Sequence, residues 1–302
     1  MSKRLKKALL ILLLISIPGI GLIFGWVFLG APKPLISQKA FPDPNGYNDL
    51  AAAGKLLSRT SSTEDPATLS IEQLRELNAT NAEALKRARL GLSRECAVPM
   101  TYSATSTVHI ANLSSMKGIA RAFVAEGRLE ELEHHDDEAA RSYLDVIHLS
   151  QSSARGGMLI DQLVSIAIEA IGVTHLHGLI GALDAKTCRE TATALETLDA
   201  QRQPWAQVLA QEKDWAYRTY GALRYRFAQL TEGRAMKATQ ERTEQRCNGQ
   251  IRNTRQLLVA LAARAYELEK GRRPARLADL VPDYLKAVPQ DPLTGKDLDY
   301  KP

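Results

Sequence analysis

The sequence predicts a mainly α-helical protein in which one N-terminal transmembrane helix precedes an extracytoplasmic bundle of several helices. Three observations support this fold class. Residues 8–30 of the 302-residue chain form an apolar run. Much of the rest of the chain repeats its apolar residues at intervals of three and four, which is the periodicity of a helix. No segment alternates apolar and polar residues over a length that would indicate a sheet.

Residues 8–30 contain no charged side chain and are long enough to cross a membrane. A helix rises about 1.5 Å per residue, so about 20 apolar residues span a hydrocarbon core of about 30 Å. Basic residues precede the run and no acidic residue does: Lys3, Arg4, Lys6 and Lys7. Because cytoplasmic flanks retain positive charge, we expect a single-pass protein of the cytoplasmic (inner) membrane, with the N-terminus inside and the bulk of the chain outside.

A cleaved signal peptide is the alternative interpretation of the same run. The apolar region of such a peptide usually has about 7–15 residues and ends at a small-x-small site. This run is longer, and Pro32 lies beside the weak candidate site at residues 29–31. We therefore expect an uncleaved anchor with the lipid bilayer as its partner, and cleavage stays open.

The basic surplus of the chain lies mostly in this leader. The sequence has 39 Lys and Arg against 34 Asp and Glu, a formal net charge of +5. Taking away the four leader residues leaves 35 against 34, so the charge does not indicate a surface for nucleic acid. Besides the bilayer, we expect protein partners.

Composition and periodicity divide the chain into four segments. Residues 32–46 are rich in proline and lack helical periodicity, which is typical of a linker. The expected segments are a cytoplasmic leader and transmembrane anchor at 1–31, the linker at 32–46, an α-helical domain at 47–250, and a C-terminal helix with a proline-rich tail at 251–302.

Apolar spacing and capping residues predict the helices in order. Ser70 and Gln73 form a capping box at one helix start, while Asn81, Asp136 and Asp184 are expected to cap three further helices. The expected helices are 47–58, 71–80, 82–93, 108–133, 137–154, 158–183, 185–200, 204–230 and 251–270. For residues 231–250, which have few large apolar side chains, an exposed helix and a mobile loop both stay open.

Residues 158–183 form the most apolar stretch outside the anchor. Four ionisable side chains lie within it: Asp161, Glu169, His175 and His177. A charge near the centre of a membrane span costs about 2.5–3.5 kcal/mol. We therefore expect the central buried helix of the domain, enclosed by its neighbours, rather than a second span.

The tail that follows residue 270 is expected to fold as a packed cap. Apolar residues such as Leu277, Leu280 and Tyr284 recur among prolines, and each proline lowers the entropy lost on ordering. We expect this cap to cover the 251–270 helix, with a small β-hairpin near Leu298 and Tyr300 as an option.

The tail combines three motifs. Gly271 and Pro274 form a Gly-x-x-Pro exit from the helix, Pro289, Asp291 and Pro292 form a Pro-x-Asp-Pro loop, and Tyr300 is a late tyrosine. This pattern resembles the C-terminal segment of the major pseudopilin of type II secretion. The leader departs from that family, because Lys7 runs directly into Ala8 without the cleavable glycine or the glutamate at the fifth position of the apolar helix. Processing and filament assembly are therefore not implied.

A larger part of the chain, residues 125–132, 139–145 and 161–172, resembles uncharacterised bacterial membrane-anchored helical proteins that share this tail. That group supplies no activity, cofactor or site residue.

Two motifs have the residue types of a catalytic or metal site. Ser114 and Lys117 have the S-x-x-K spacing of penicillin-recognising enzymes, but no Ser-Asp-Asn or Lys-Thr-Gly element accompanies them. Residues 133–138 combine histidines with carboxylates that could bind a metal. Consecutive side chains diverge, however, so a polar turn between helices is favoured, and we expect no metal and no cofactor.

Asp161 and Glu169 are acids on the most apolar helix. Buried carboxylates with raised pKa values can be catalytic. Structural pairing with Arg121, Arg141 or Arg155 is the favoured interpretation.

Three further groups of polar residues are more simply structural. His175 and His177 do not share a helix face, and Asp291, Asp297 and Asp299 fit a turn better than a calcium loop. The interleaved tyrosines and arginines of residues 217–227 fit an amphipathic helix.

The three cysteines, Cys96, Cys188 and Cys247, are far apart and odd in number. One disulfide and three separate thiols both stay open.

The sequence therefore favours an extracytoplasmic scaffold or interaction domain without catalytic residues. Two alternatives stay open. One is an accessory component of a secretion or pilus-like apparatus, which the tail implies, and the other is an extracytoplasmic hydrolase with an unrecognised carboxylate site.

Overall fold

The computed structural model describes residues 40–58, 65–103 and 107–301. The expected anchor at 8–30 and most of the expected linker lie outside these residues. The described chain is mainly helical, as predicted, with seven α-helices and no strand. The helices are α2 (Gly46–Leu56), α4 (Ile71–Leu92), α5 (Thr107–Leu132), α6 (Asp136–Ala154), α7 (Leu159–Leu179), α8 (Ala185–Ala200) and α9 (Trp205–Lys270), with short 3₁₀ helices η1 (Pro66–Thr68) and η2 (Leu277–Leu280).

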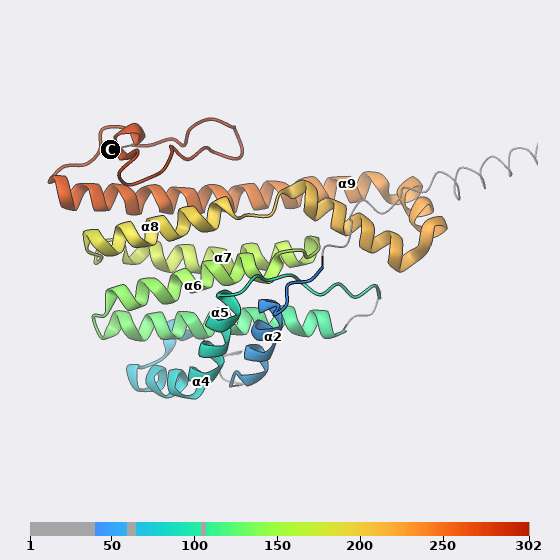
Figure 1. Cartoon of the computed structure of the whole chain (residues 1–302), viewed down its shortest axis with the longest axis horizontal. Coiled ribbons are helices and arrows are strands. Elements are labelled where there is room, and N and C mark those ends of the chain that lie inside the picture. Colours follow the sequence, from blue (N-terminus) through green and yellow to red (C-terminus); the bar gives the residue numbers. More distant parts are fainter. Residues whose placement is uncertain (1–39, 59–64, 104–106, 302) are drawn as a thin grey trace, which may run out of the picture.

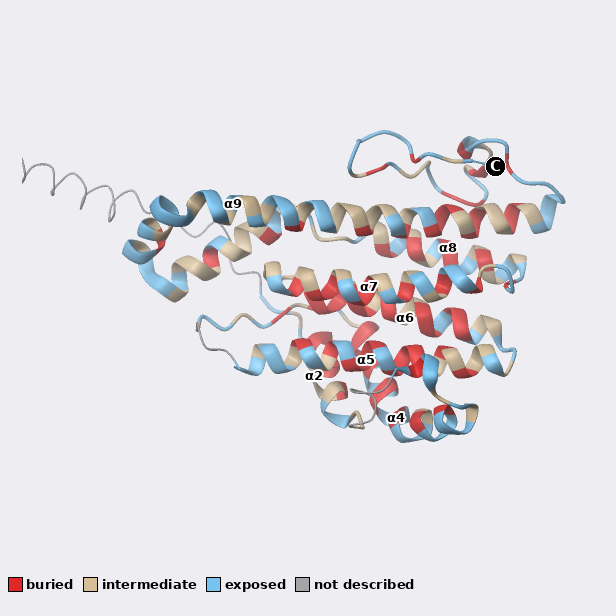
Figure 2. Cartoon of the chain, turned by 180° about the vertical axis from the view of Figure 1, so that it is seen from behind, coloured by how far each residue is buried: buried red, intermediate tan, exposed pale blue. Residues whose placement is uncertain are grey.

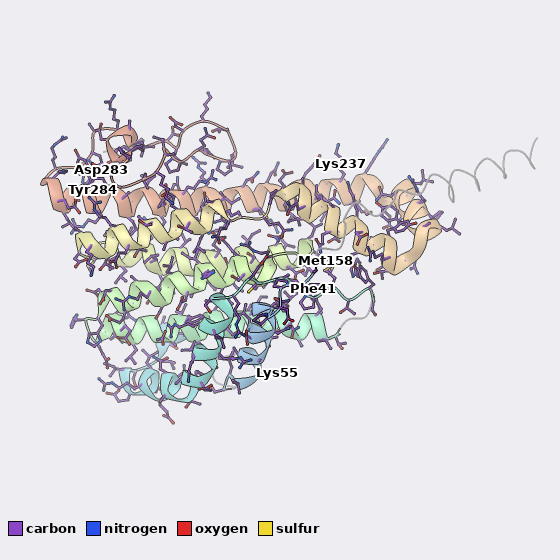
Figure 3. All side chains as sticks on the ribbon, viewed as in Figure 1. Phe41, Lys55, Met158, Lys237, Asp283 and Tyr284 are labelled. Atoms are coloured by element: carbon purple, nitrogen blue, oxygen red, sulfur yellow. The ribbon has the colours of Figure 1, made fainter. Side chains whose placement is uncertain are left out.

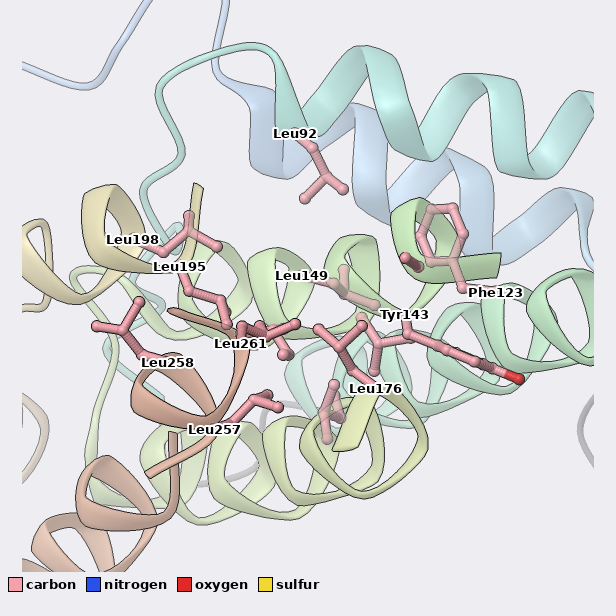
Figure 4. Packing of buried hydrophobic residues seen from close by; sticks show 14 of the residues in the cluster. Leu92, Phe123, Tyr143, Leu149, Leu176, Leu195, Leu198, Leu257, Leu258 and Leu261 are labelled. Atoms are coloured by element: carbon pink, nitrogen blue, oxygen red, sulfur yellow. The ribbon is translucent and has the colours of Figure 1, made fainter. Parts of the chain in front are cut away.

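The helices stack side by side in layers (Figure 1). α5, α6 and α7 lie across the middle, α2 and α4 cover one side, and α8, α9 and the tail cover the other. Buried residues follow the facing sides of the stacked helices, and the outward sides are exposed (Figure 2). Leucines from α4, α6, α7, α8 and α9 meet Phe123 and Tyr143 in one continuous core (Figure 4).

Two glycines let the middle helices approach closely around Tyr143. A Cβ atom at Gly127 of α5 would lie 2.6 Å from Cε1 of Tyr143, and one at Gly172 of α7 would lie 3.0 Å from the Tyr143 carbonyl oxygen and 2.8 Å from Ile147. A side chain at Gly127 would displace the Tyr143 ring, and one at Gly172 would displace Ile147 and press on the Tyr143 carbonyl. The α5–α6–α7 layer therefore depends on these glycines.

Capping residues set several of the helix ends as predicted. The Ser70 hydroxyl accepts from the N–H of Gln73 at the start of α4, and Asp184 does the same for Thr187 at the start of α8. Gly271 ends α9 in the left-handed conformation, with φ 70°, which glycine adopts without strain.

Two predicted helix starts are wrong. Asn81 lies inside the single helix α4, where its side chain is buried and accepts from the N–H of Ser58 at 3.0 Å. An asparagine that bonds a neighbouring loop looks the same in sequence as one that caps a helix. At α6, His135 is the N-cap residue and Asp136 is the first residue of the helix.

α9 joins what the periodicity divided into two helices. The expected helix at 204–230, the ambiguous residues 231–250 and the expected helix at 251–270 are continuous. The exception is Gly221, which has non-helical angles at φ 77° and ψ 164°. The first part of α9 runs to the right-hand end of Figure 1, and the second part returns along α8 to the left.

α7 lies between α6 and α9, as the prediction of a central helix requires. Its burial is one-sided: Ile168 and Leu176 are buried, whereas Ile160 and Ile171 are exposed. Among the described residues, α7 is the one helix with the length and apolar composition to cross a membrane. The expected enclosure of α7 by its neighbours is therefore wrong for its exposed side, whereas the side packed against α6 and α9 fits a helix of the bundle.

The tail is packed, as predicted. Leu277, Leu280, Leu285 and Leu298 are buried in the same core as the helices, and the Tyr300 hydroxyl donates to the Pro274 carbonyl at 3.1 Å. The optional β-hairpin is reduced, within the described residues, to one isolated bridge between positions 290 and 297.

Candidate functional site

Asp161 is a buried carboxylate in the first turn of α7. Its Oδ2 accepts from the backbone N–H of Met158 at 2.7 Å, and its Oδ1 lies 3.2 Å from Nε2 of His109 on α5. The interaction with Asp161 raises the pKa of His109, and burial opposes this change. A Cβ at Gly157 would lie 2.6 Å from Cγ of Asp161, so this glycine admits the carboxylate beneath the loop.

Other groups near Asp161 share its buried surroundings. Glu212 of α9 accepts from the N–H of Leu159 at 3.0 Å, and burial, with a smaller contribution from Asp161, raises its pKa. Burial also raises the pKa of the Tyr47 hydroxyl, and Asp161 raises it further. Neither Glu212 nor Tyr47 can carry a positive charge. Protonated His109 supplies the positive charge next to Asp161.

This pair predicts a pH-dependent contribution to stability. The folded pKa of His109 lies above the unfolded value of about 6.5. The contribution is therefore complete below pH 6.5 and is lost as pH rises through the folded pKa. In urea titrations, His109→Gln is expected to destabilise the protein more at pH 5.5 than at pH 8.5. The exposed His177→Gln is the control; an equal loss for His109→Gln at both pH values would contradict the assignment.

An apolar cavity of about 430 Å³ opens beside this pair. The irregular segment 99–103, the first turns of α5 and α7, and Trp215 of α9 form its wall. The Trp215 indole N–H donates to the Thr101 carbonyl at 2.9 Å, which fixes the ring against the segment. The lining residues are Pro99, Met100, Thr101, Ser103, Thr107, His109, Ile110, Met158, Ile160 and Trp215. Such a lining fits apolar groups, with His109 as its ionisable member.

Glu169, two turns further along α7, is the second buried acid. Both of its oxygens accept from the guanidinium of Arg202, and Oε1 also accepts from the Thr254 hydroxyl at 2.6 Å. Asp199 accepts from Nε of Arg202 at 2.7 Å and from Nε of Arg255 at 2.8 Å. Burial lowers the pKa of Arg202, but Glu169 and Asp199 outweigh it and raise the pKa overall. Arg202 therefore stays charged and joins α7 to the α8–α9 connection.

A polar cavity of about 250 Å³ borders Glu169 and Arg202. Gln151, Trp205 and Gln250 line it and carry buried nitrogen atoms without a hydrogen-bond partner in the described structure. Cys247 also lines it, and burial raises the pKa of its thiol to about 11. A thiol with a raised pKa is a poor nucleophile at neutral pH, so the chemistry indicated here is hydrogen bonding.

The acids of α7 are paired, but not with the predicted partners. His109 and Arg202 take the roles that the sequence assigned to Arg121, Arg141 or Arg155. Arg141 instead pairs with Asp137 on its own helix at 2.7 Å, and Arg155 donates to the Gln201 carbonyl.

The S-x-x-K pair lies apart from both cavities. Ser114 and Lys117 are exposed on α5, and neither lines the apolar or the polar cavity.

The acidic and histidine-rich turn brings Glu130, Glu133 and His135 together, with ligand atoms within 4.8 Å of one another. Glu130 had no role in the sequence motif; it lies in the last turn of α5, three residues before Glu133, which follows the helix. Nδ1 of His135 contacts Glu130 at 2.9 Å, and Arg75 contacts Glu133 at 2.8 Å. A guanidinium already neutralises this cluster, so the polar turn remains the better interpretation.

The remaining histidines and aspartates have structural positions. His175 stacks on Tyr143 with ring centroids 5.0 Å apart, and burial lowers its pKa. Asp291 is buried in a turn, where Oδ1 accepts from the N–H of Leu293 and Oδ2 lies 3.5 Å from Arg252. Asp297 and Asp299 are exposed.

All three cysteines are free thiols: Cys96 and Cys188 are buried and Cys247 is half-buried.

No protein-family model, no curated protein and no solved structure matches this chain. The function is therefore argued from the residues themselves.

Proposed function

We propose that this chain is a single-pass membrane protein whose helical domain lies outside the cytoplasmic membrane and binds another protein as a scaffold. The apolar run at 8–30 and its basic flank support the anchor and its orientation. The apolar cavity beside His109 is the observation that carries the binding role.

The mouth of this cavity offers apolar contact area that the described part of the chain leaves uncovered. Ile110 is 60% exposed and Ile160 is 41% exposed, while Val108, beside the cavity, is 70% exposed. Exposed apolar surface around a concave site is typical of protein-binding surfaces. An apolar segment of a partner protein fits this mouth best.

The contacts made by the two buried acids, Asp161 and Glu169, support a scaffold rather than a hydrolase. A carboxylate that acts as a general acid or base must reach the substrate. The oxygens of Asp161 face Met158 and His109, and those of Glu169 face Arg202 and Thr254. Both acids therefore have structural contacts that a catalytic role would have to break.

The topology and the binding role have separate tests. Protease added to spheroplasts should digest the bulk of the chain, and full protection would overturn the orientation. A photo-cross-linking residue at position 110 should capture a discrete protein partner in intact membranes. The same residue at position 293, an exposed leucine in the tail, is the matched control.

Identical cross-links at positions 110 and 293, or none at 110, would overturn the assigned binding site. Cross-links from 293 to components of a secretion or pilus-like apparatus would favour that alternative instead.

A further inference from the structure

The bend of α9 exposes an apolar stripe. Leu223, Phe227 and Leu230 are 55%, 65% and 71% exposed. They recur at intervals of four and three, so they lie on one face of the helix that follows Gly221. Such a spacing is typical of a packing face, yet no part of the described chain buries it. A side-by-side set of large apolar residues in water is unfavourable without a partner.

Basic residues surround this stripe. Between residues 218 and 237 there are five basic side chains, Arg218, Arg224, Arg226, Arg234 and Lys237, and one acid, Glu232, a net charge of +4. At 3.6 residues per turn, Arg224 and Arg226 fall on opposite sides of the stripe. The chain without its leader has a surplus of one positive charge, so the rest of it is net negative. The positive charge is therefore concentrated at the bend.

Ion pairs with two acids outside this stretch, Asp214 and Glu241, offset two of its positive charges and leave a net charge of +2. Asp214 contacts Arg218 at 3.0 Å and Glu241 contacts Lys237 at 3.8 Å, at the two ends of the stretch. The guanidinium of Arg224 lies over the ring of Tyr220, 5.1 Å from the ring centroid. A cationic side chain on an aromatic ring beside an apolar stripe is typical of a membrane-interface helix.

We propose that the bend of α9 lies on a bilayer surface that contains anionic phospholipid. Leu223, Phe227 and Leu230 enter the boundary between headgroups and acyl chains, and Arg224 and Arg234 contact the phosphates. This contact is additional to the proposed anchor and rests on α9 alone.

Chain length allows the anchor and the bend to meet the same membrane. Nine residues, 31–39, separate the expected anchor from the first described residue. Extended, they reach about 30 Å. In Figure 1 the described chain starts nearer to the end of the bundle where α9 bends than to the end where α9 finishes, and Figure 3 places Phe41, Met158 and Lys237 in this half of the view.

A second copy of the chain fits the stripe less well. Two such bends facing each other would bring two net positive charges together, whereas anionic headgroups would neutralise them. Lipid is therefore the occupant with complementary charge.

The test uses tryptophan fluorescence of the full chain in vesicles. Phe227→Trp is reconstituted in phosphatidylcholine, or in phosphatidylcholine mixed with phosphatidylglycerol, with a nitroxide lipid labelled near the headgroup. The difference from the parent protein gives the quenching of the added tryptophan. Leu268→Trp, an exposed position at the other end of α9, is the matched control.

We expect quenching at position 227 to be at least about twofold stronger in anionic than in neutral vesicles, because interfacial helices combine apolar burial with attraction to anionic lipid. Salt near 1 M, where the Debye length is about 3 Å, should reduce it. Arg224→Gln with Arg234→Gln should reduce it as well. Position 268 should show little quenching in either vesicle.

Equal quenching at positions 227 and 268, or none at 227, would overturn the proposal. A blue-shifted but unquenched Phe227→Trp whose shift grows with protein density would assign the stripe to a second copy. Either result leaves the protease and cross-linking tests untouched, so failure here is distinguishable from failure of the proposed function.

Discussion

Replacing Arg202 with methionine is expected to lower the free energy of unfolding by about 3–5 kcal/mol, because Glu169 would remain buried without its ionic partner. The Arg202 side chain is 17% exposed and that of Glu169 is 3% exposed, so water replaces little of the lost interaction. The Thr254 hydroxyl would then be the remaining side-chain donor to the Glu169 carboxylate in the described structure. The measurement is urea unfolding of the full chain in micelles, followed by circular dichroism.

Two control variants separate this effect from a general loss of packing. Glu169→Gln combined with Arg202→Met removes both charges and should recover much of the stability, since the cost comes from the unpaired ion. Arg141→Met removes a pair whose side chains are 64% and 46% exposed, and exposed pairs contribute about 0–1 kcal/mol. A loss for Arg202→Met as small as that for Arg141→Met would show that the Glu169 cluster is not a structural centre.

The partners of these acids show the limit of the sequence. Helical periodicity shows that Asp161 and Glu169 lie on an apolar helix, so burial and pairing could be expected. It does not show which helix lies opposite. Arg202 is 33 residues from Glu169 and follows α8 in a connection without periodicity. The pair forms because the connection between α8 and α9 lies against α7, and that depends on long-range packing.

Local signals account for what was predicted correctly. The hydroxyl of Ser70, the carboxylate of Asp184 and the freedom of Gly271 act within one helical turn, so they are readable from neighbouring residues. Long-range contacts explain the error at Asn81 and the continuity of α9 through residues 231–250. The side chain of Asn81 bonds to Ser58 in a neighbouring segment, and α9 continues as a helix because it returns along α8.

The two cavities and the exposed stripe of α9 also depend on tertiary packing, which neighbouring residues in the sequence do not reveal. The spacing of Leu223, Phe227 and Leu230 fits a helix face, but exposure depends on what else reaches the bend. The apolar cavity combines four separate chain segments around Trp215. No single window of sequence contains it.

Placing an aspartate at Ile168 is expected to destabilise the protein by about 3 kcal/mol or more, because it buries an unpaired carboxylate. Ile168 is 1% exposed on the inner face of α7. Ile171, three residues further on, is 37% exposed. Ile171→Asp is therefore expected to change the free energy of unfolding by about 1 kcal/mol or less.

This comparison tests whether α7 is a bundle helix or a membrane span, since its length and composition alone permit both. In a bundle, the two substitutions differ because one residue faces the core and the other faces water. In a bilayer, both positions lie near the middle of the helix, and an aspartate at either would cost about 2.5–3.5 kcal/mol. Urea unfolding and carbonate extraction of each variant from membranes give the measurement. Similar, large losses for Ile168→Asp and Ile171→Asp would contradict the bundle, because only a surrounding lipid phase penalises both faces of α7 alike.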